Sequence, residues 1–105
     1  MKKVIAISEI VGTVEKDQTL YEVCATLDAA YDDTTSELVT QLDSYARPLG
    51  PSGDAGRVLL DELPRKETVR EPVALDEAGS AAKDIFHTWA RKVRQAIPNL
   101  TPRGP

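Results

Sequence analysis

Residues 19–46, TLYEVCATLDAAYDDTTSELVTQLDSYA, decide the expected fold, because their pattern predicts two helices joined by a short connector. A capping box opens each helix, at Thr19–Glu22 and at Thr34–Glu37, where a Thr hydroxyl and a Glu carboxylate can satisfy free amides of the first turn. Apolar residues follow at helical spacing: Leu20, Val23, Cys24, Leu27 and Tyr31, then Leu38, Val39, Leu42, Tyr45 and Ala46. Because the connector is so short, we expect an antiparallel helical hairpin in which Leu27 and Leu42 face each other.

On the N-terminal side of this hairpin, Lys3–Val11 is rich in β-branched residues and predicts a strand that ends at Gly12. Apolar side chains fall on both faces of the strand, so we expect it to be covered on both sides. Periodicity alone leaves a short helix open as the alternative.

The segment Glu9-Ile10-Val11-Gly12-Thr13, followed by an expected acidic helix, is similar to the opening of dodecins, which are small flavin-storing proteins. The similarity covers the strand, the turn and the start of the expected helix. A second helix is expected where that family has two long strands, so we do not carry the flavin-storing function over to this chain.

On the C-terminal side, Pro48–Gly56 (PLGPSGDAG) has the composition of a loop or linker. Arg57–Leu63 is a short apolar segment, and its pattern fits either a strand or one or two helical turns. Glu67–Leu75 is expected to be extended, because Pro72 cannot donate to a helical hydrogen-bond ladder and biases the residue before it towards the β region.

The last expected element is a long amphipathic helix from Asp76 or Ser80 to Ile97, ended by Pro98. Its apolar residues fall in one stripe at 100° per residue: Ala78, Ala82, Ile85, Phe86, Trp89, Val93, Ala96 and Ile97. The fold class expected from all these elements is helix-rich α+β, with all-α as the alternative. We expect one small domain over residues 1–98, with an internal linker at 48–56 and a flexible tail at 99–105.

The composition indicates the cellular compartment that suits the protein and how its charge is distributed. Its 105 residues contain one cysteine, Cys24, so no intrachain disulfide can form, and a reducing cytoplasm fits best. The longest uninterrupted apolar run, Val4–Ile7, is too short to cross a membrane. Residues 1–46 hold nine carboxylates and three lysines, whereas residues 47–105 hold ten cationic and eight acidic side chains. The chain is therefore acidic in its first half and basic towards its end.

Two sets of residues on the final helix are candidate binding surfaces. The first is an interaction face formed by Ile85, Phe86, Trp89 and Val93, since aromatic residues concentrate at binding hot spots, although core packing is the commoner role. The second is an electrostatic ridge on the polar side of the helix, formed by Lys83, His87, Arg91 and Arg94. Such a ridge could contact phosphates or an acidic protein surface, or could simply be solvated.

No catalytic constellation is visible in the sequence, and we expect no catalytic residue, cofactor or metal. With one His and one Cys, a zinc site would need carboxylates for its other ligands, and no such cluster is suitably spaced. A dyad of Cys24 and His87 is conceivable, but Cys24 falls on an apolar stripe, where burial is the better expectation. Residues 50–56 are rich in glycine, as phosphate-binding loops are. A phosphate-binding loop leads into a helix that begins with Lys and Ser or Thr, and no such helix start follows here.

The function expected from these observations is that of a non-enzymatic interaction or assembly module, acting by self-association or by docking on a larger partner. A nucleic-acid-associated accessory protein using the ridge is the second hypothesis, and the net charge of −4 argues against it. A small ligand-binder or enzyme with a site at a subunit interface is the third.

Overall fold

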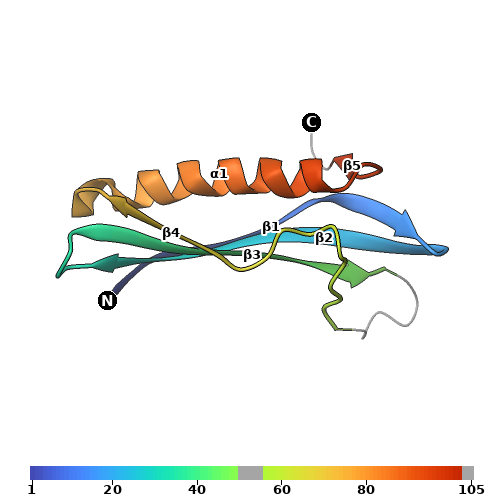
Figure 1. The fold of residues 1–105 in the computed structure, drawn as a ribbon, viewed down its shortest axis with the longest axis horizontal. Helices are drawn as coiled ribbons and strands as arrows, with labels where there is room; N and C mark the ends of the chain where they lie inside the picture. The colour runs from blue at the N-terminus through green and yellow to red at the C-terminus, as the bar shows by residue number, and fades with distance from the viewer. Residues whose placement is uncertain (50–55, 103–105) are drawn as a thin grey trace.

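Residues 19–46 form two long antiparallel strands in a computed structural model, which describes residues 1–49 and 56–102 of the chain. The five-stranded antiparallel sheet has the strand order β4-β3-β2-β1-β5, and one helix lies across one of its faces (Figure 1). The elements are β1 (Lys2–Lys16), β2 (Thr19–Asp32), β3 (Glu37–Pro48), β4 (Glu67–Pro72), a single 3₁₀ turn η1 (Leu75–Glu77), α1 (Ala78–Ala96) and β5 (Thr101–Pro102).

The expected helical hairpin is therefore wrong, and with it both the helix-rich α+β class and the all-α alternative. The fold is sheet-rich α+β. The apolar residues of β2 also fit a period of two, as Val23, Ala25, Leu27, Ala29 and Tyr31, all of which are buried. Leu27 does face Leu42, as expected, but as a cross-strand pair between β2 and β3. In the strand, alternation places Ala25 and Ala29 in the buried set beneath the helix. The helical stripe expected from the sequence does not include these two alanines.

The residues interpreted as capping boxes lie at hairpin turns. Asp17 and Gln18 have φ values of 50° and 66° and connect the paired residues Lys16 and Thr19, so two positive-φ residues form a tight turn without glycine. In the next turn, the backbone N–H of Thr34 donates to Oδ1 of Asp32 at 3.0 Å. Thr and Asp suit both turns and helix starts, so these residues did not distinguish a strand hairpin from a helix hairpin.

Strand β1 is the expected N-terminal strand, but it does not end at Gly12. It continues to Lys16 through register shifts between Lys3 and Ile5 and between Ile10 and Gly12, which mark β-bulges. Strand β2 follows its turn, where the similarity to dodecins required a helix, so the resemblance does not extend to the fold. The C-terminal segment crosses Gly12, where a Cβ atom would lie 2.5 Å from the carbonyl oxygen of Thr101 and 2.8 Å from Cγ of Leu100.

Helix α1 confirms the expected C-terminal helix. Its buried side chains are Ala78, Ala82, Phe86, Trp89, Ala90 and Val93, and they pack on Val23, Leu27, Leu38 and Leu42 of the sheet. Within residues 1–49 and 56–102, no helix is both long and apolar enough to cross a membrane. At about 1.5 Å per residue the 19 residues of α1 span roughly 28 Å, less than the 49 Å length of the molecule. The β1–β2 hairpin therefore projects beyond the helix (Figure 1).

Residues 56–66, which precede β4, contribute to the core. Val58 exchanges two backbone hydrogen bonds with Ala46, while Leu60 and Leu63 pack against the core. Residues 67–72 form β4, which confirms that part of the extended segment expected over Glu67–Leu75, whereas Leu75 itself begins the 3₁₀ turn η1. Most of the expected linker, residues 50–55, lies outside the described residues, as do residues 103–105 of the expected tail. Thr101 and Pro102 of that tail pair with Thr13 and Gly12.

The contact over Gly12 gives a direct test of the fold. Gly12→Ala should lower the free energy of unfolding by about 1–3 kcal/mol, because its methyl group overlaps backbone that must shift. Gly79→Ala in α1, where a Cβ atom meets nothing within 4 Å, should instead be neutral or stabilising by up to about 1 kcal/mol. Urea unfolding of both variants measures the difference, and equal stabilities would contradict the packing of residues 100–101 on β1.

Candidate interaction surface

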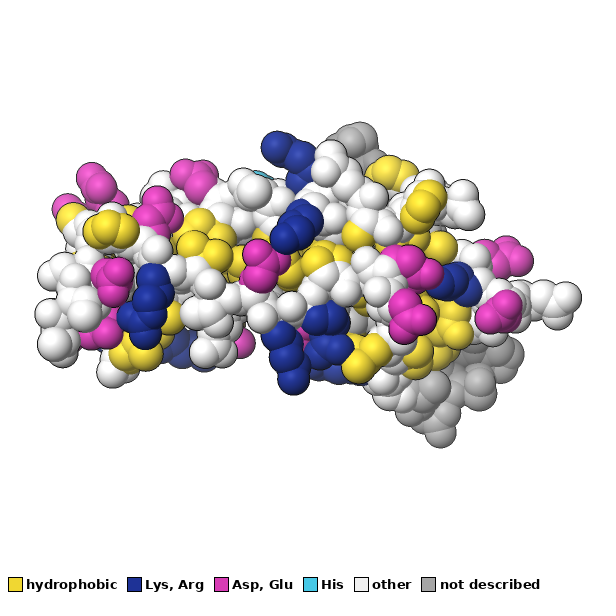
Figure 2. Space-filling view, viewed as in Figure 1, with side chains coloured by type: hydrophobic (Ala, Val, Ile, Leu, Met, Phe, Trp, Pro, Cys, Tyr) yellow, Lys and Arg dark blue, Asp and Glu magenta, His cyan; other side chains and the backbone are white. Residues whose placement is uncertain are grey.

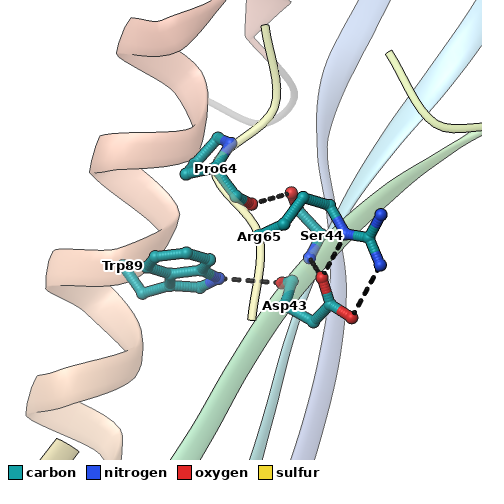
Figure 3. A network of polar contacts seen from close by, with 5 residues as sticks. All are labelled: Asp43, Ser44, Pro64, Arg65 and Trp89. Atoms are coloured by element: carbon teal, nitrogen blue, oxygen red, sulfur yellow. Dashed lines mark hydrogen bonds and ion pairs between the residues drawn. The ribbon is translucent and has the colours of Figure 1, made fainter. Parts of the chain in front are cut away.

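Trp89 attaches α1 to strand β3. Its indole N–H donates to the backbone carbonyl of Asp43 at 2.8 Å, while its side chain is buried between helix and sheet (Figure 3). The neighbouring Ser44 hydroxyl donates to the carbonyl of Pro64 at 2.6 Å. These hydrogen bonds lie between two paired regions of β3. Strand β4 pairs with β3 as far as Leu42, and Val58 pairs with it at Ala46.

The carboxylate of Asp43 completes this network. Nε of Arg65 lies 2.7 Å from its Oδ1, Nη2 lies 3.4 Å from its Oδ2, and the backbone N–H of Ser44 also donates to Oδ1, at 2.8 Å. The Arg65 guanidinium, assisted by the Ser44 amide, holds the pKa of the Asp43 carboxyl below its usual range, and partial burial opposes this effect. The ion pair thereby fixes the chain just before β4 against the edge of β3.

This network holds α1 and residues 64–65 against β3 and has no arrangement suited to catalysis. The Ser44 hydroxyl donates to a carbonyl, and the Asp43 carboxylate is engaged by Arg65 and Ser44, so neither group is arranged as a nucleophile with its base. Cys24 is buried, as expected, but it lies on the sheet face away from α1, opposite Ile10 and Tyr45. Cys24 and His87 are therefore not brought together. No cluster of three or more His, Cys, Asp or Glu residues suited to a metal ion occurs in the described ranges.

Three of the four residues of the expected interaction face are buried in the core of the same chain. Phe86 is 2% exposed, Trp89 is 3% exposed and Val93 is fully buried. Ile85 is half-buried and lines a groove of about 460 Å³ between α1 and β4, together with Val69 and Ala81. Figure 2 shows hydrophobic side chains in a band between the helix and the sheet. The ion pair between Lys92 of α1 and Glu67 of β4, at 2.7 Å, spans this groove.

The electrostatic ridge lies on the side of α1 that faces β1. Lys83, His87 and Arg91 are exposed and Arg94 is half-buried, and none of them forms an ion pair with another residue in the described part of the chain. Lys83 and His87 border a hollow of about 250 Å³ whose other lining residues are Ile5, Ile7, Glu9 and Phe86. The structure therefore brings two ridge residues next to apolar side chains of β1.

Strand β1 also has an unpaired side, which we call the open β1 edge and define as the side of Lys2–Val11 that faces away from β2. Among residues 1–49 and 56–102, β5 is the one strand paired on that side, and it reaches only Gly12 and Thr13. Ala6 and Ser8 are exposed, while Ile5 and Ile7 are half-buried. Unpaired backbone along a regular strand is a template for another strand.

The sheet register shows which backbone groups face this edge. Leu20 of β2 accepts a hydrogen bond from the N–H of Leu49, so even-numbered residues of β2 direct their backbone groups towards β3 and odd-numbered ones towards β1. Leu27 is odd-numbered and lies opposite Ile7. Because backbone direction alternates along a strand, Ala6 and Ser8 direct their N–H and C=O groups to the open edge.

The opposite edge of the sheet is protected. Strand β4 has six residues, carries Glu67, Arg70 and Glu71, and ends at Pro72. Short length, charged side chains and proline are the features that discourage edge-to-edge pairing. The open β1 edge is longer and has an uncharged core from Val4 to Ser8. The two edges of one sheet thus differ in their capacity to accept a strand.

Sequence reasoning found the ridge but missed the open edge. The run Val4-Ile5-Ala6-Ile7 was visible as a strand signal, but whether a strand lies at an edge depends on strand order, which periodicity does not reveal. In comparisons with known proteins, no family model, no curated protein and no solved structure matches this chain.

The Asp43–Arg65 pair gives a pH-dependent prediction. The lowered pKa of Asp43 means that its contribution to stability is present above the ordinary Asp value of about 3.9 and is lost as the pH falls through the folded-state value. The free energy of unfolding should therefore fall as the pH is lowered from about 5, and should fall less in Asp43→Asn. Asp33→Asn, at an exposed turn position, serves as the control. Identical pH slopes for both variants would contradict a role for the pair.

Proposed function

We propose that this chain is a non-enzymatic protein-interaction module that binds an extended segment of a protein along the open β1 edge. The observation that supports this proposal best is that, in the part of the chain that the structure describes, one side of Lys2–Val11 is unpaired while the other edge of the sheet is protected. A bound strand would form backbone hydrogen bonds with Ala6 and Ser8. Strand addition to an exposed edge is a recurring mode of peptide recognition, in which the backbone supplies affinity and alternate side chains supply specificity.

The hollow beside the edge supports a preference for particular side chains. Every second side chain of an added strand would lie on the α1 side of the sheet, next to Ile5, Ile7 and the ridge residues Lys83 and His87. Apolar side chains fit over the two isoleucines, and acidic side chains would complement the cations of the ridge. We therefore expect a partner segment in which apolar and acidic residues alternate on one face.

The same ridge gives less support to nucleic-acid binding. The net charge of the chain is −4, and the hollow beside Lys83 and His87 also contains the carboxylate of Glu9. Phosphate recognition usually relies on a domain with a net basic surface. An enzymatic function has less support, because the Ser44 hydroxyl and the Trp89 indole donate to backbone carbonyls and the Asp43 carboxylate is engaged by Arg65.

A peptide selection tests this function without a known partner. A random peptide library is panned against the protein immobilised at low density, and the selected peptides are measured against two variants. Ser8→Pro removes an N–H that faces the open edge and should abolish binding while keeping the fold, because proline is tolerated where the N–H points away from the ladder. Thr68→Pro, the equivalent outward-facing position of β4, should bind as well as the wild type.

The selected sequences and the two variants decide the outcome together. Peptides with alternating apolar residues that bind the wild type and Thr68→Pro, but not Ser8→Pro, are the expected result. Peptides that bind Ser8→Pro with unchanged affinity would contradict binding along the open β1 edge. Circular dichroism and urea unfolding of both variants confirm that the sheet is retained.

A further inference from the structure

We infer that the open β1 edge pairs with the same edge of a second copy of this chain, antiparallel about a two-fold axis at Ala6, to form one ten-stranded sheet. The inference rests on the proposed function, since it names the segment that this edge accepts. The length of the edge, the order of its side chains and its charges support this pairing.

The length of the edge places the axis near its middle. Within the described residues, β5 pairs with Gly12 and Thr13 alone, which leaves the stretch from Lys2 to Val11 unpaired on this side. The midpoint of that stretch falls between Ala6 and Ile7. Residues that are opposite in an antiparallel pair project to the same face, so a self-paired strand must have its two-fold axis at a residue rather than between two residues. An axis at Ala6 makes the Ala6 pair a hydrogen-bonded one, because its backbone groups point outward.

The order of the side chains selects Ala6 from the neighbouring positions. An axis at Ala6 places Ile5 opposite Ile7 of the second copy, so that four isoleucines meet on the α1 side of the joined sheet. An axis at Ile7 would place Ile5 opposite Glu9, and an axis at Ser8 would place Ile7 opposite Glu9. Aliphatic β-branched pairs stabilise cross-strand contacts, whereas a carboxylate opposite isoleucine does not.

The charges of β1 fit the same register. With the axis at Ala6, the exposed Lys2 and Lys3 lie alongside Glu9 of the second copy, and the symmetry repeats this cluster at the other end of the seam. The bulge between Lys3 and Ile5 brings Lys2 to the α1 side of the sheet, where Glu9 lies. Exposed ion pairs contribute little to affinity, so these clusters favour the register, and the backbone and isoleucine contacts supply most of the affinity.

The symmetry of the pairing predicts a closed dimer. A two-fold interface uses the same edge of both copies, and the edges left at the ends of the joined sheet are those of β4, which charges and Pro72 protect. Both α1 helices would lie on one face of the sheet, on either side of the seam. Glu9 of each copy would then lie between Lys83 of its own chain and Lys2 and Lys3 of the second copy. Its negative charge would reduce the repulsion between the electrostatic ridges of the two copies.

Charge reversal tests the register. Light scattering and sedimentation over a range of concentrations should show a dimer for the wild type. Glu9→Lys, and separately Lys2→Glu with Lys3→Glu, should each weaken dimerisation at low salt, on the order of tenfold, because like charges then lie opposite each other. The triple variant with both changes should recover most of the loss. Glu71→Lys, an exposed reversal on β4, is the matched control and should dimerise as the wild type does.

Each other outcome overturns a defined part of the inference. A wild type that stays monomeric at all concentrations would exclude the second copy, whereas peptide binding that is lost in Ser8→Pro would still support the proposed function. A dimer that is lost in Ser8→Pro but ignores the charge reversals would overturn the axis at Ala6. A dimer that persists in Ser8→Pro would overturn pairing along the open β1 edge.

Discussion

One helix has to cover one face of a five-stranded sheet, and the attachment of Trp89 to β3 determines how it does so. The indole N–H bonded to Asp43 holds α1 on the β3 side of the sheet, while Phe86 reaches the isoleucines of β1 on the other side. The end of the helix then delivers the C-terminal segment to Gly12, where β5 pairs with β1. Within the described residues, no other segment pairs with this side of β1, so Lys2–Val11 forms the open β1 edge.

The sequence was sufficient for the elements whose pattern had one interpretation. A period of 3.6 residues over Ala78–Ala96 fits only a helix, and the proline in Glu67–Pro72 excludes one. Residues 19–46 had two interpretations. Alanines such as Ala25 and Ala29 suit helices by propensity, and the strand conformation is decided by cross-strand pairs such as Leu27 with Leu42, which local sequence does not contain.

The candidate surface was predictable in its charges and unpredictable in its geometry. The ridge cations follow from helical spacing, and Lys83 and His87 do lie together beside β1. The apolar stripe was assigned to a possible interaction face, yet Trp89 and Val93 are needed to cover the sheet of their own chain. The open edge depends on strand order, which the sequence pattern of residues 19–46 does not determine because that pattern fits both helices and strands.

The most direct measurement of the central claim is amide hydrogen exchange, resolved by residue in β1, at low and at high protein concentration. Ile7 bonds to β2 within the chain, so its amide should be protected at both concentrations. The amides of Ala6 and Ser8 should exchange fast when the protein is dilute and become protected when it is concentrated. Exchange of Ala6 and Ser8 that is equally fast at both concentrations would contradict the account, as would equal protection at both.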